Sequence, residues 1–192
     1  MVTRIFCWLR DTRLLSYALF AILVVFGFHL WLTPAQAQIN CQTLPHWSST
    51  SPVINLHHVF CGEFNHGRPK GLHSRPGGAN PATVAELRLT EPANAQGIYG
   101  ARWSYRGHTD LPKFSTFFPD RCNRNQVLQS VAYAANHLTA CPAGAPSWAR
   151  CGANQPSGGN AASYCTANNG QRFSIALGLL NDGRVNTAFP LR

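Results

Sequence analysis

Apolar side chains recur at helical spacing over one stretch of the chain, residues 123–137. This spacing predicts a helix with one apolar face. Asn123 or Asn125 is a suitable N-cap, because an asparagine side chain accepts a hydrogen bond from the first turn, and Cys141-Pro142 ends the pattern. The apolar face consists of Val127, Leu128, Val131, Ala134, Ala135 and Leu138.

Three segments before this helix are rich in β-branched and aromatic residues, and we predict a strand in each. They are Val53–Phe64, Thr83–Leu89 and Gly97–Tyr105. Between the first two lies Gly67–Pro81, which contains four glycines and three prolines. Such a composition predicts a loop.

The chain ends in two apolar runs, Phe173–Leu180 and Val185–Leu191, joined by Asn181-Asp182-Gly183. An Asp-Gly turn between apolar runs predicts a β-hairpin. The preceding segment Pro142–Asn169 is rich in Gly, Ala, Ser, Asn and Pro, and is predicted to be a long loop. Together these elements predict an α+β fold, mostly antiparallel sheet with one main helix.

The N-terminal segment has the features of a targeting sequence. Three arginines precede the uncharged run Leu14–Leu32, and Pro34 breaks this run before Ala35-Gln36-Ala37. A basic start, an apolar stretch and a small-x-small site predict a secretory signal peptide over residues 1–37, cleaved before Gln38. The alternative is an uncleaved anchor, because the run approaches the length of a membrane span. After cleavage, a single domain of residues 38–192 is expected, secreted or periplasmic and not stably associated with a membrane.

Cysteine usage supports export. Removal of residues 1–37 takes away Cys7 and leaves an even set of six cysteines. In an exported chain such a set predicts up to three disulfides, whose pairing the sequence does not decide. A zinc site is disfavoured, since no Cys-x-x-Cys pair occurs. The six are Cys41, Cys61, Cys122, Cys141, Cys151 and Cys165.

The composition fits a folded basic protein. Hydrophobic residues make up 45% of the 192 residues and charged residues 12%, which excludes a disordered chain. Lysine and arginine number 16 against 7 acids, a net charge of +9, and 14 of the 16 are arginine. Because the guanidinium group donates two hydrogen bonds to one phosphate, this charge is compatible with a polyanionic partner. A merely soluble basic protein is the alternative.

Four histidines lie within 17 residues: His57, His58, His66 and His73. Histidine titrates near neutral pH, so two of them can act as the base and the acid of one site. His58 falls in the predicted strand and His73 in the glycine-rich loop, so that a rigid element and a loop each supply one imidazole. The alternatives are surface histidines or histidines that bind a metal.

Lys113 is the only lysine outside the Gly/Pro-rich loop, and it precedes a run of hydroxyl and aromatic side chains. A lone ammonium in such a place is suited to stabilise charge that develops on a phosphate. Alternatively, it is an ordinary solvated lysine.

Four segments resemble motifs of the EndoU endoribonuclease family. His57–Glu63 contains a match to H-(V/I)-F-x-G-E, and Gly71–Ser74 is similar to the second histidine motif. Lys113–Pro119 resembles the lysine motif of bacterial members, and Gly183–Pro190 resembles their closing G-x-(I/V)-x-T-A-(Y)-P. The four occur in the family's order and cover about residues 55–191.

The resemblance implies a barnase-like nuclease fold, in which a helix packs on a curved antiparallel sheet. It also implies four catalytic residues, His58, His73, Lys113 and Thr187. One histidine would take the proton of the RNA 2′-hydroxyl, the other would protonate the leaving 5′-oxygen, and Lys113 would stabilise the phosphate charge. The product would be a 2′,3′-cyclic phosphate.

The resemblance further implies substrate contacts by Ser115, Thr116, Phe189 and Glu63. Phe189 stands where the family has tyrosine, which keeps stacking on a base and removes a hydrogen bond. This departure affects base preference more than catalysis. Glu63 matches a family carboxylate and is alternatively structural, fixing a histidine tautomer.

The expected partners follow from the same resemblance. The substrate is RNA, the protein is expected to be a monomer, and a small immunity protein is a further partner if the nuclease serves as a toxin. No cofactor is required by the chemistry, although the resemblance leaves a response to manganese open. The competing interpretations are a secreted binding or toxin-accessory module that has lost catalysis, and a metal-dependent hydrolase, which the scarcity of acidic residues disfavours.

Overall fold

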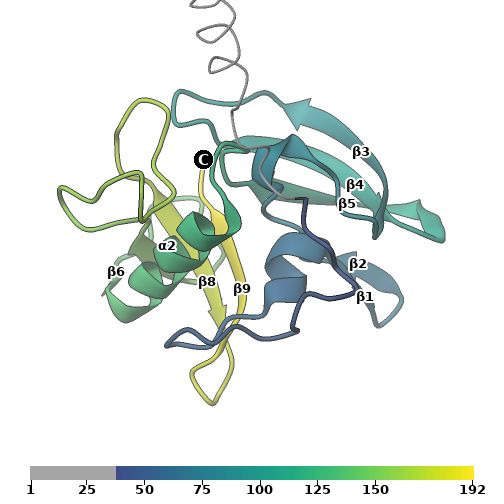
Figure 1. The fold of residues 1–192 in the computed structure, drawn as a ribbon, viewed down its shortest axis with the longest axis horizontal. Coiled ribbons are helices and arrows are strands. Elements are labelled where there is room, and N and C mark those ends of the chain that lie inside the picture. The colour runs from purple at the N-terminus through teal and green to yellow at the C-terminus, as the bar shows by residue number, and fades with distance from the viewer. Residues whose placement is uncertain (1–37) are drawn as a thin grey trace, which may run out of the picture. The chain divides into compact units, whose positions relative to one another are not determined.

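The computed structural model describes residues 38–192 (Figure 1). The predicted signal peptide, and the anchor that is its alternative, lie outside the described residues. Within the described part of the chain, no helix has the length and apolar character needed to cross a membrane.

The fold is α+β, as predicted: one main helix accompanies three antiparallel sheets in residues 38–192. The first sheet pairs β1 (Glu63–Asn65) with β2 (Arg68–Lys70). The second has the order β3 (Val84–Glu91), β4 (Tyr99–Tyr105) and β5 (His108–Phe117). The third has the order β6 (Leu138–Thr139), β7 (Arg150–Ala153), β8 (Ser174–Leu179) and β9 (Val185–Pro190).

The predicted helix is α2, Arg124–Asn136, and Figure 1 shows it lying across the four-stranded sheet. Asn123 is its N-cap: the Asn123 side chain accepts from the Gln126 N–H at 2.9 Å, and the Gln126 side chain accepts from the Asn123 N–H at 2.7 Å. This reciprocal capping satisfies two free N–H groups of the first turn. The buried face packs into the larger core with residues of β8 and β9.

The strand predicted over Val53–Phe64 is wrong for most of its length. Residues His57–Cys61 form a single π-helical turn, η1, and a strand begins only at Glu63. Four of the five η1 residues are buried, His58 among them, so the turn has almost no exposed face and shows neither helical nor strand periodicity. A short apolar run of this kind does not distinguish a buried strand from a buried helical turn.

The other strand predictions before α2 are confirmed, with shifted ends: β3 and β4 occupy the two predicted segments. β5 lies in a segment for which no strand was predicted, and two short strands were missed in segments expected to be loop. β2 and the short 3₁₀ turn η2 (Pro76–Gly78) both lie in the Gly/Pro-rich segment, and β7 lies inside 142–169. Each of these two short strands has four residues or fewer, and its partner strand supplies the pairing that its own composition does not predict.

The C-terminal hairpin is confirmed. β8 and β9 pair antiparallel, with Ile175 opposite Pro190 and Gly178 opposite Thr187. Gly183 in the connecting turn has φ 84°, a conformation that favours glycine. This register places Thr187 and Phe189 on the strand that borders the site described below.

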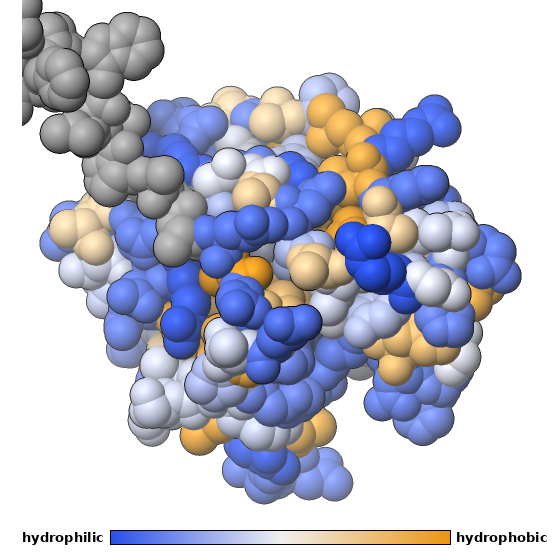
Figure 2. Space-filling view, turned by 45° about the vertical axis from the view of Figure 1, so that its right-hand side comes forward, coloured by the Kyte–Doolittle hydropathy of each residue, from blue (hydrophilic) through white to orange (hydrophobic). Residues whose placement is uncertain are grey.

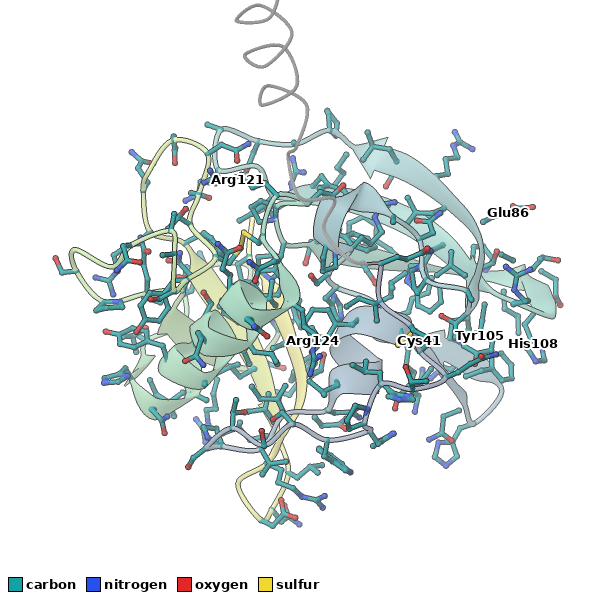
Figure 3. All side chains as sticks on the ribbon, viewed as in Figure 1. Cys41, Glu86, Tyr105, His108, Arg121 and Arg124 are labelled. Atoms are coloured by element: carbon teal, nitrogen blue, oxygen red, sulfur yellow. A yellow bond between two sulfur atoms is a disulfide. The ribbon has the colours of Figure 1, made fainter. Side chains whose placement is uncertain are left out.

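Two hydrophobic cores meet beside η1. The larger core lies between α2 and the four-stranded sheet, and the smaller core lies around the buried Trp103 of β4. The sheets are tied at their junction by the Thr116 hydroxyl, which donates to the Pro190 carbonyl at 2.8 Å. At the far end of the β4–β5 hairpin, Figure 3 shows Tyr105 and His108 together, and the Phe64 ring of β1 stacks on His108 at 3.6 Å.

The six cysteines form three disulfides, as expected for an exported chain. Cys41 is bonded to Cys61 at the end of η1, Cys122 to Cys165, and Cys141 to Cys151. The second and third bonds fix the long segment before β8 at both of its ends. Three disulfides indicate an oxidising compartment, such as the periplasm or the cell exterior.

Loss of a disulfide is expected to destabilise the domain by about 2–5 kcal/mol. The Cys122–Cys165 bond closes a longer segment than Cys141–Cys151, 43 against 10 residues. Its removal by paired serine substitutions should therefore cost about 1 kcal/mol more, because the cost grows with the logarithm of the closed length. Denaturant unfolding of both double variants measures the difference, and equal or reversed losses would contradict the expectation.

Candidate active site

A cavity of about 780 Å³ lies at the junction of the sheets. Seven of the eight residues predicted for the site line it, while Glu63 does not and lies behind His58. The seven come from η1, the segment after β2, β5 and β9. They are His58, His73, Lys113, Ser115, Thr116, Thr187 and Phe189.

His58 is held by Asn55, which precedes η1, and by Glu63 of β1. Its backbone N–H donates to the Asn55 side-chain oxygen at 3.0 Å, and its Nδ1 lies 2.7 Å from a Glu63 carboxylate oxygen. Because a carboxylate only accepts hydrogen bonds, Nδ1 carries the proton and Nε2 is the nitrogen left for the cavity. Glu63 therefore fixes the tautomer and orientation of the His58 ring.

The Glu63 carboxylate is kept ionised by its surroundings. Partial burial alone would raise the pKa of Glu63, but the hydrogen bond and charge of His58, with Asn55 and His46, outweigh it and hold this pKa below its ordinary value. The Asn55 amide donates to Glu63 at 3.3 Å and to the Asn186 side chain at 3.1 Å. Asn55 thereby connects the His58 side of the site to β9.

His73 is buried beneath the cavity, next to His58. Its Nδ1 donates to the Thr116 carbonyl of β5 at 3.0 Å, so Nε2 is again the free nitrogen. The His58 and His73 ring centroids are 6.1 Å apart. Burial lowers the pKa of His73 well below its ordinary value, and the charges of Lys113 and His58 lower this pKa further. His73 is therefore neutral at neutral pH.

The segments that carry the two histidines are hydrogen-bonded directly to each other. The Leu72 N–H donates to the His58 carbonyl at 2.7 Å, and the His73 N–H donates to the Val59 carbonyl at 2.8 Å. Gly71 makes this approach feasible: it has φ 71°, and a Cβ added there would lie 2.1 Å from the His58 carbonyl oxygen. Only glycine fits at that position.

Lys113 lies on β5 with its ammonium fully engaged. Nζ donates to the Ser115 hydroxyl at 2.7 Å, to the Phe114 carbonyl at 3.0 Å and to the Gly71 carbonyl at 3.2 Å. Burial lowers the pKa of Lys113 to about 8. The buried Ser115 hydroxyl also donates to Gly71 and accepts from the Trp103 indole, so its hydrogen-bonding capacity is used in holding the lysine.

The opposite wall of the cavity comes from β9. The Phe189 ring stacks on His73, with centroids 5.1 Å apart and planes at 28°. Thr187 lies two residues earlier on the same strand and also lines the cavity, and its hydroxyl has no hydrogen bond to another residue among 38–192. The Thr116 hydroxyl of β5 donates to the Pro190 carbonyl of β9 and so connects β5 to this wall.

Sequence reasoning missed several residues of the site, among them Asn55 and Trp148 and the cavity-lining Arg68 and Lys70. Asn55 lies before the first histidine motif, and nothing in its local sequence distinguishes it from an asparagine in a loop. Trp148 lies in the segment expected to be loop; it lines the cavity and contacts Phe189 edge to face at 6.1 Å. An aromatic residue in a segment rich in Gly, Ser and Pro was the signal available for it.

The mouth of the cavity is basic. Arg68 and Lys70 of β2 line it beside Lys113, against one acidic side chain, Asp110, among the described lining residues. Figure 2 shows that polar and charged side chains predominate on the face in view, with hydrophobic side chains exposed in small groups. The three cationic side chains against one carboxylate at the cavity favour an anionic ligand.

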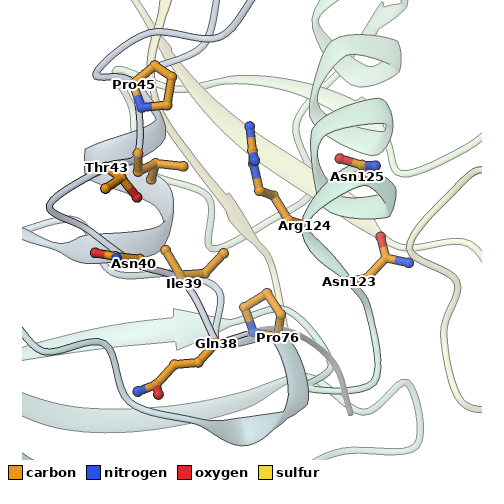
Figure 4. Close-up of a pocket in the computed structure, with 10 residues that line it drawn as sticks. Gln38, Ile39, Asn40, Thr43, Pro45, Pro76, Asn123, Arg124 and Asn125 are labelled. Carbon is orange, nitrogen blue, oxygen red and sulfur yellow. The ribbon is translucent and has the colours of Figure 1, made fainter. Parts of the chain in front are cut away.

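A second cavity, about 360 Å³, lies between residues 38–45 and the start of α2. Figure 4 shows Arg124 extending into it from the helix. None of the predicted site residues lines this cavity, and it contains no pair of groups for proton transfer. It is therefore not the candidate active site.

The described residues do not fit a metal centre. No group of three His, Cys, Asp or Glu side chains within 38–192 is arranged to hold a metal ion. The manganese that the family resemblance left open thus has no matching set of ligands there, and we derive no step through a metal.

The position of His73 gives a measurable pH dependence. In an NMR titration, the His73 ring should take up its proton well below pH 6.5, because burial and Lys113 disfavour the charged form. Lys113→Gln should raise the pKa of His73, and Lys70→Gln, farther out on β2, should change it less. In the unfolded chain the His73 ring protonates near pH 6.5. The stability contributed by the neutral, buried ring is therefore complete above pH 6.5, and it is lost as the pH falls towards the pKa of His73 in the folded protein. A His73 pKa at or above 6.5 would contradict this.

Comparison with known proteins identifies the family. The family model of the bacterial EndoU nuclease matches residues 52–192, most of the chain and nearly all of the described part. No curated protein and no solved structure matches the chain. The matched region contains every residue that lines the larger cavity. The chain therefore belongs to the bacterial EndoU nuclease family.

Proposed function

We propose that the protein is a secreted endoribonuclease that cleaves RNA by attack of the 2′-hydroxyl. The observation that carries this is the pairing of two imidazoles, 6.1 Å apart, with a lysine in one cavity. One imidazole is held neutral by burial, and the other is hydrogen-bonded to a carboxylate. Nuclease family membership agrees with this chemistry.

His73 is proposed to act as the general base. Its pKa is lowered well below its ordinary value, so the ring is neutral and Nε2 is free to accept a proton at neutral pH. The bond from Nδ1 to the Thr116 carbonyl fixes this orientation. A base must be unprotonated before it acts, and His73 meets that condition over the physiological range.

His58 is proposed to act as the general acid. The Glu63 carboxylate at 2.7 Å stabilises the imidazolium through Nδ1, which leaves the Nε2 proton for the leaving group. The two histidines thus differ in the partner of Nδ1, a carbonyl for one and a carboxylate for the other. These unequal partners separate the two roles.

The reaction balances without a cofactor. His73 takes the proton of the 2′-hydroxyl, the 2′-oxygen bonds to phosphorus, and the bond from phosphorus to the 5′-oxygen breaks as His58 gives that oxygen a proton. Lys113 and Thr187 stabilise charge on the non-bridging oxygens, and Ser115 positions Lys113. The products are a 2′,3′-cyclic phosphate end and a 5′-hydroxyl end.

The purified protein is expected to cut RNA and to leave DNA of the same sequence intact, in the presence of EDTA. The attacking group is the 2′-hydroxyl, so a single 2′-deoxy substitution at the cut site should block cleavage there. Mass spectrometry of the fragments should find cyclic phosphate ends. Equal cutting of both polymers, or no cutting of RNA, would refute the proposal; the second result would leave a binding module with this fold.

A further inference from the structure

Trp148 is an exposed aromatic side chain at the edge of the active-site cavity. It is 58% exposed, although it lines the cavity and touches Phe189. Its segment is closed by the Cys141–Cys151 disulfide, and β7 begins at Arg150, two residues after it. The covalent closure limits how far the indole can move from the cavity.

The surface under Trp148 accommodates the indole closely. A Cβ added at Gly178 of β8 would lie 3.2 Å from the Trp148 ring and 2.6 Å from the Thr187 methyl group. The absence of a side chain at Gly178 therefore lets the indole lie against the β8–β9 hairpin, beside Thr187. The rest of the indole remains open to solvent.

An indole placed in this way has a large flat surface that the protein itself does not cover. Exposed apolar groups beside a site commonly mark a surface that a ligand covers. Nucleobases stack on aromatic side chains, and such stacking tolerates any base because every base has a π-face. Arg68 and Lys70 on the same cavity supply charge for the backbone of the strand.

We propose that Trp148 is a second base-stacking site, which binds a nucleobase next to the one that reaches Phe189. Phe189 is stacked on His73 and thus adjoins the chemistry, whereas Trp148 contacts Phe189 from farther out. A base on Trp148 therefore belongs to a neighbouring nucleotide of the same strand. This inference rests on the proposed ribonuclease function and extends its base contacts from one nucleotide to at least two.

The test measures binding separately from cleavage. The probes are fluorescently labelled 2′-O-methyl tetranucleotides of adenine and of uracil, which lack the attacking hydroxyl, each with copies that carry one abasic position. Trp148→Ala should weaken binding of the intact tetranucleotides about 5- to 150-fold, the equivalent of ~1–3 kcal/mol for one stacked base. A probe with one abasic position at the stacked base should bind the parent protein more weakly by a similar factor. The same probe should bind Trp148→Ala about as well as the intact tetranucleotide does.

Two further variants separate stacking from a structural role. Trp148→Phe keeps a π-face and should retain most of the affinity. Leu89→Ala removes an apolar side chain of comparable exposure, 55%, on β3 away from the cavity, and should bind as the parent does.

Each other outcome decides against one of the two proposals. Unchanged affinity in Trp148→Ala would overturn the second site. An equal loss for intact and abasic probes at every position would also overturn it, because the indole would then only support the cavity wall. A parent protein that binds the probes with this dependence but cuts no RNA would refute the ribonuclease function alone, and one that binds no probe would refute the stacking site.

Discussion

His73→Ala is expected to lower kcat for RNA cleavage about 10²–10⁴-fold, the usual contribution of a positioned proton-transfer group. The buried, neutral ring of His73 is the proposed base, and its imidazole stacks on Phe189 in the cavity. His58→Ala should cause a loss of similar size, because the leaving 5′-oxygen would then depart without a proton. The double variant should lose less than the product of the two factors, since each proton transfer depends on the other.

The pH profiles of these variants test the roles as well as the rates. In His73→Ala the acid limb of kcat/KM should disappear, because that limb reports protonation of the base. His137→Ala is the matched control: His137 is exposed at the C-terminus of α2, where its ring stacks on Tyr133, and it should cut RNA at the parent rate. A folded His73→Ala or His58→Ala protein with nearly parental activity would overturn the assignment.

Lys113→Met is expected to lower kcat about 10²–10³-fold while it stabilises the fold. The loss follows because a preorganised cation is removed from the place where phosphate charge develops. The gain follows because burial lowers the pKa of Lys113 to about 8, from 10.5, so the folded state disfavours the charged ammonium. Methionine fills similar space without charge, and residues placed for catalysis commonly reduce stability.

The sign of the stability effect depends on pH. Below about pH 8 the lysine is charged in both the folded and unfolded states, so the full gain from Lys113→Met should appear at pH 7. The gain should shrink between pH 8 and 10.5, as the unfolded lysine also loses its proton. Thermal unfolding at pH 7 and within the range from pH 8 to 10.5 measures this change in stability. Lys70→Met, which replaces the other lysine of the chain, is the control. A Lys113→Met protein that is less stable than the parent at pH 7 would contradict the expectation.

Local patterns predicted those features that local interactions determine. The apolar residues of the helix from Arg124 to Asn136 and its capping residue, Asn123, lie in one continuous stretch of sequence. Both could therefore be recognised without knowledge of the tertiary structure. The Asp-Gly turn likewise predicted the hairpin of β8 and β9. The site residues were found through motif resemblance, and the cavity gathers the two histidines and Lys113 from three separate segments.

Features that depend on distant partners were not predictable in this way. Asn55 matters because folding places it against His58, Glu63 and Asn186, the last of them 131 residues away. The pairing of Cys122 with Cys165 depends in the same way on the packed position of α2. The helical turn at His57–Cys61 was missed because burial on nearly all sides removed the periodicity that would have revealed it.

The division of the site between two sheets has a consequence for protein engineering. Lys113 belongs to the three-stranded sheet, whereas Thr187 and Phe189 belong to the four-stranded sheet, and the sheets meet here through Thr116 and Pro190. Randomising Phe189 and the residues between Cys141 and Cys151 would leave β5, the strand of Lys113, untouched. A library built on that principle would vary the side chains proposed to stack on bases, while Lys113, His58 and the Glu63 that holds it stay as they are, and activity on RNA would report how far the contact of Phe189 with His73 limits the exchange.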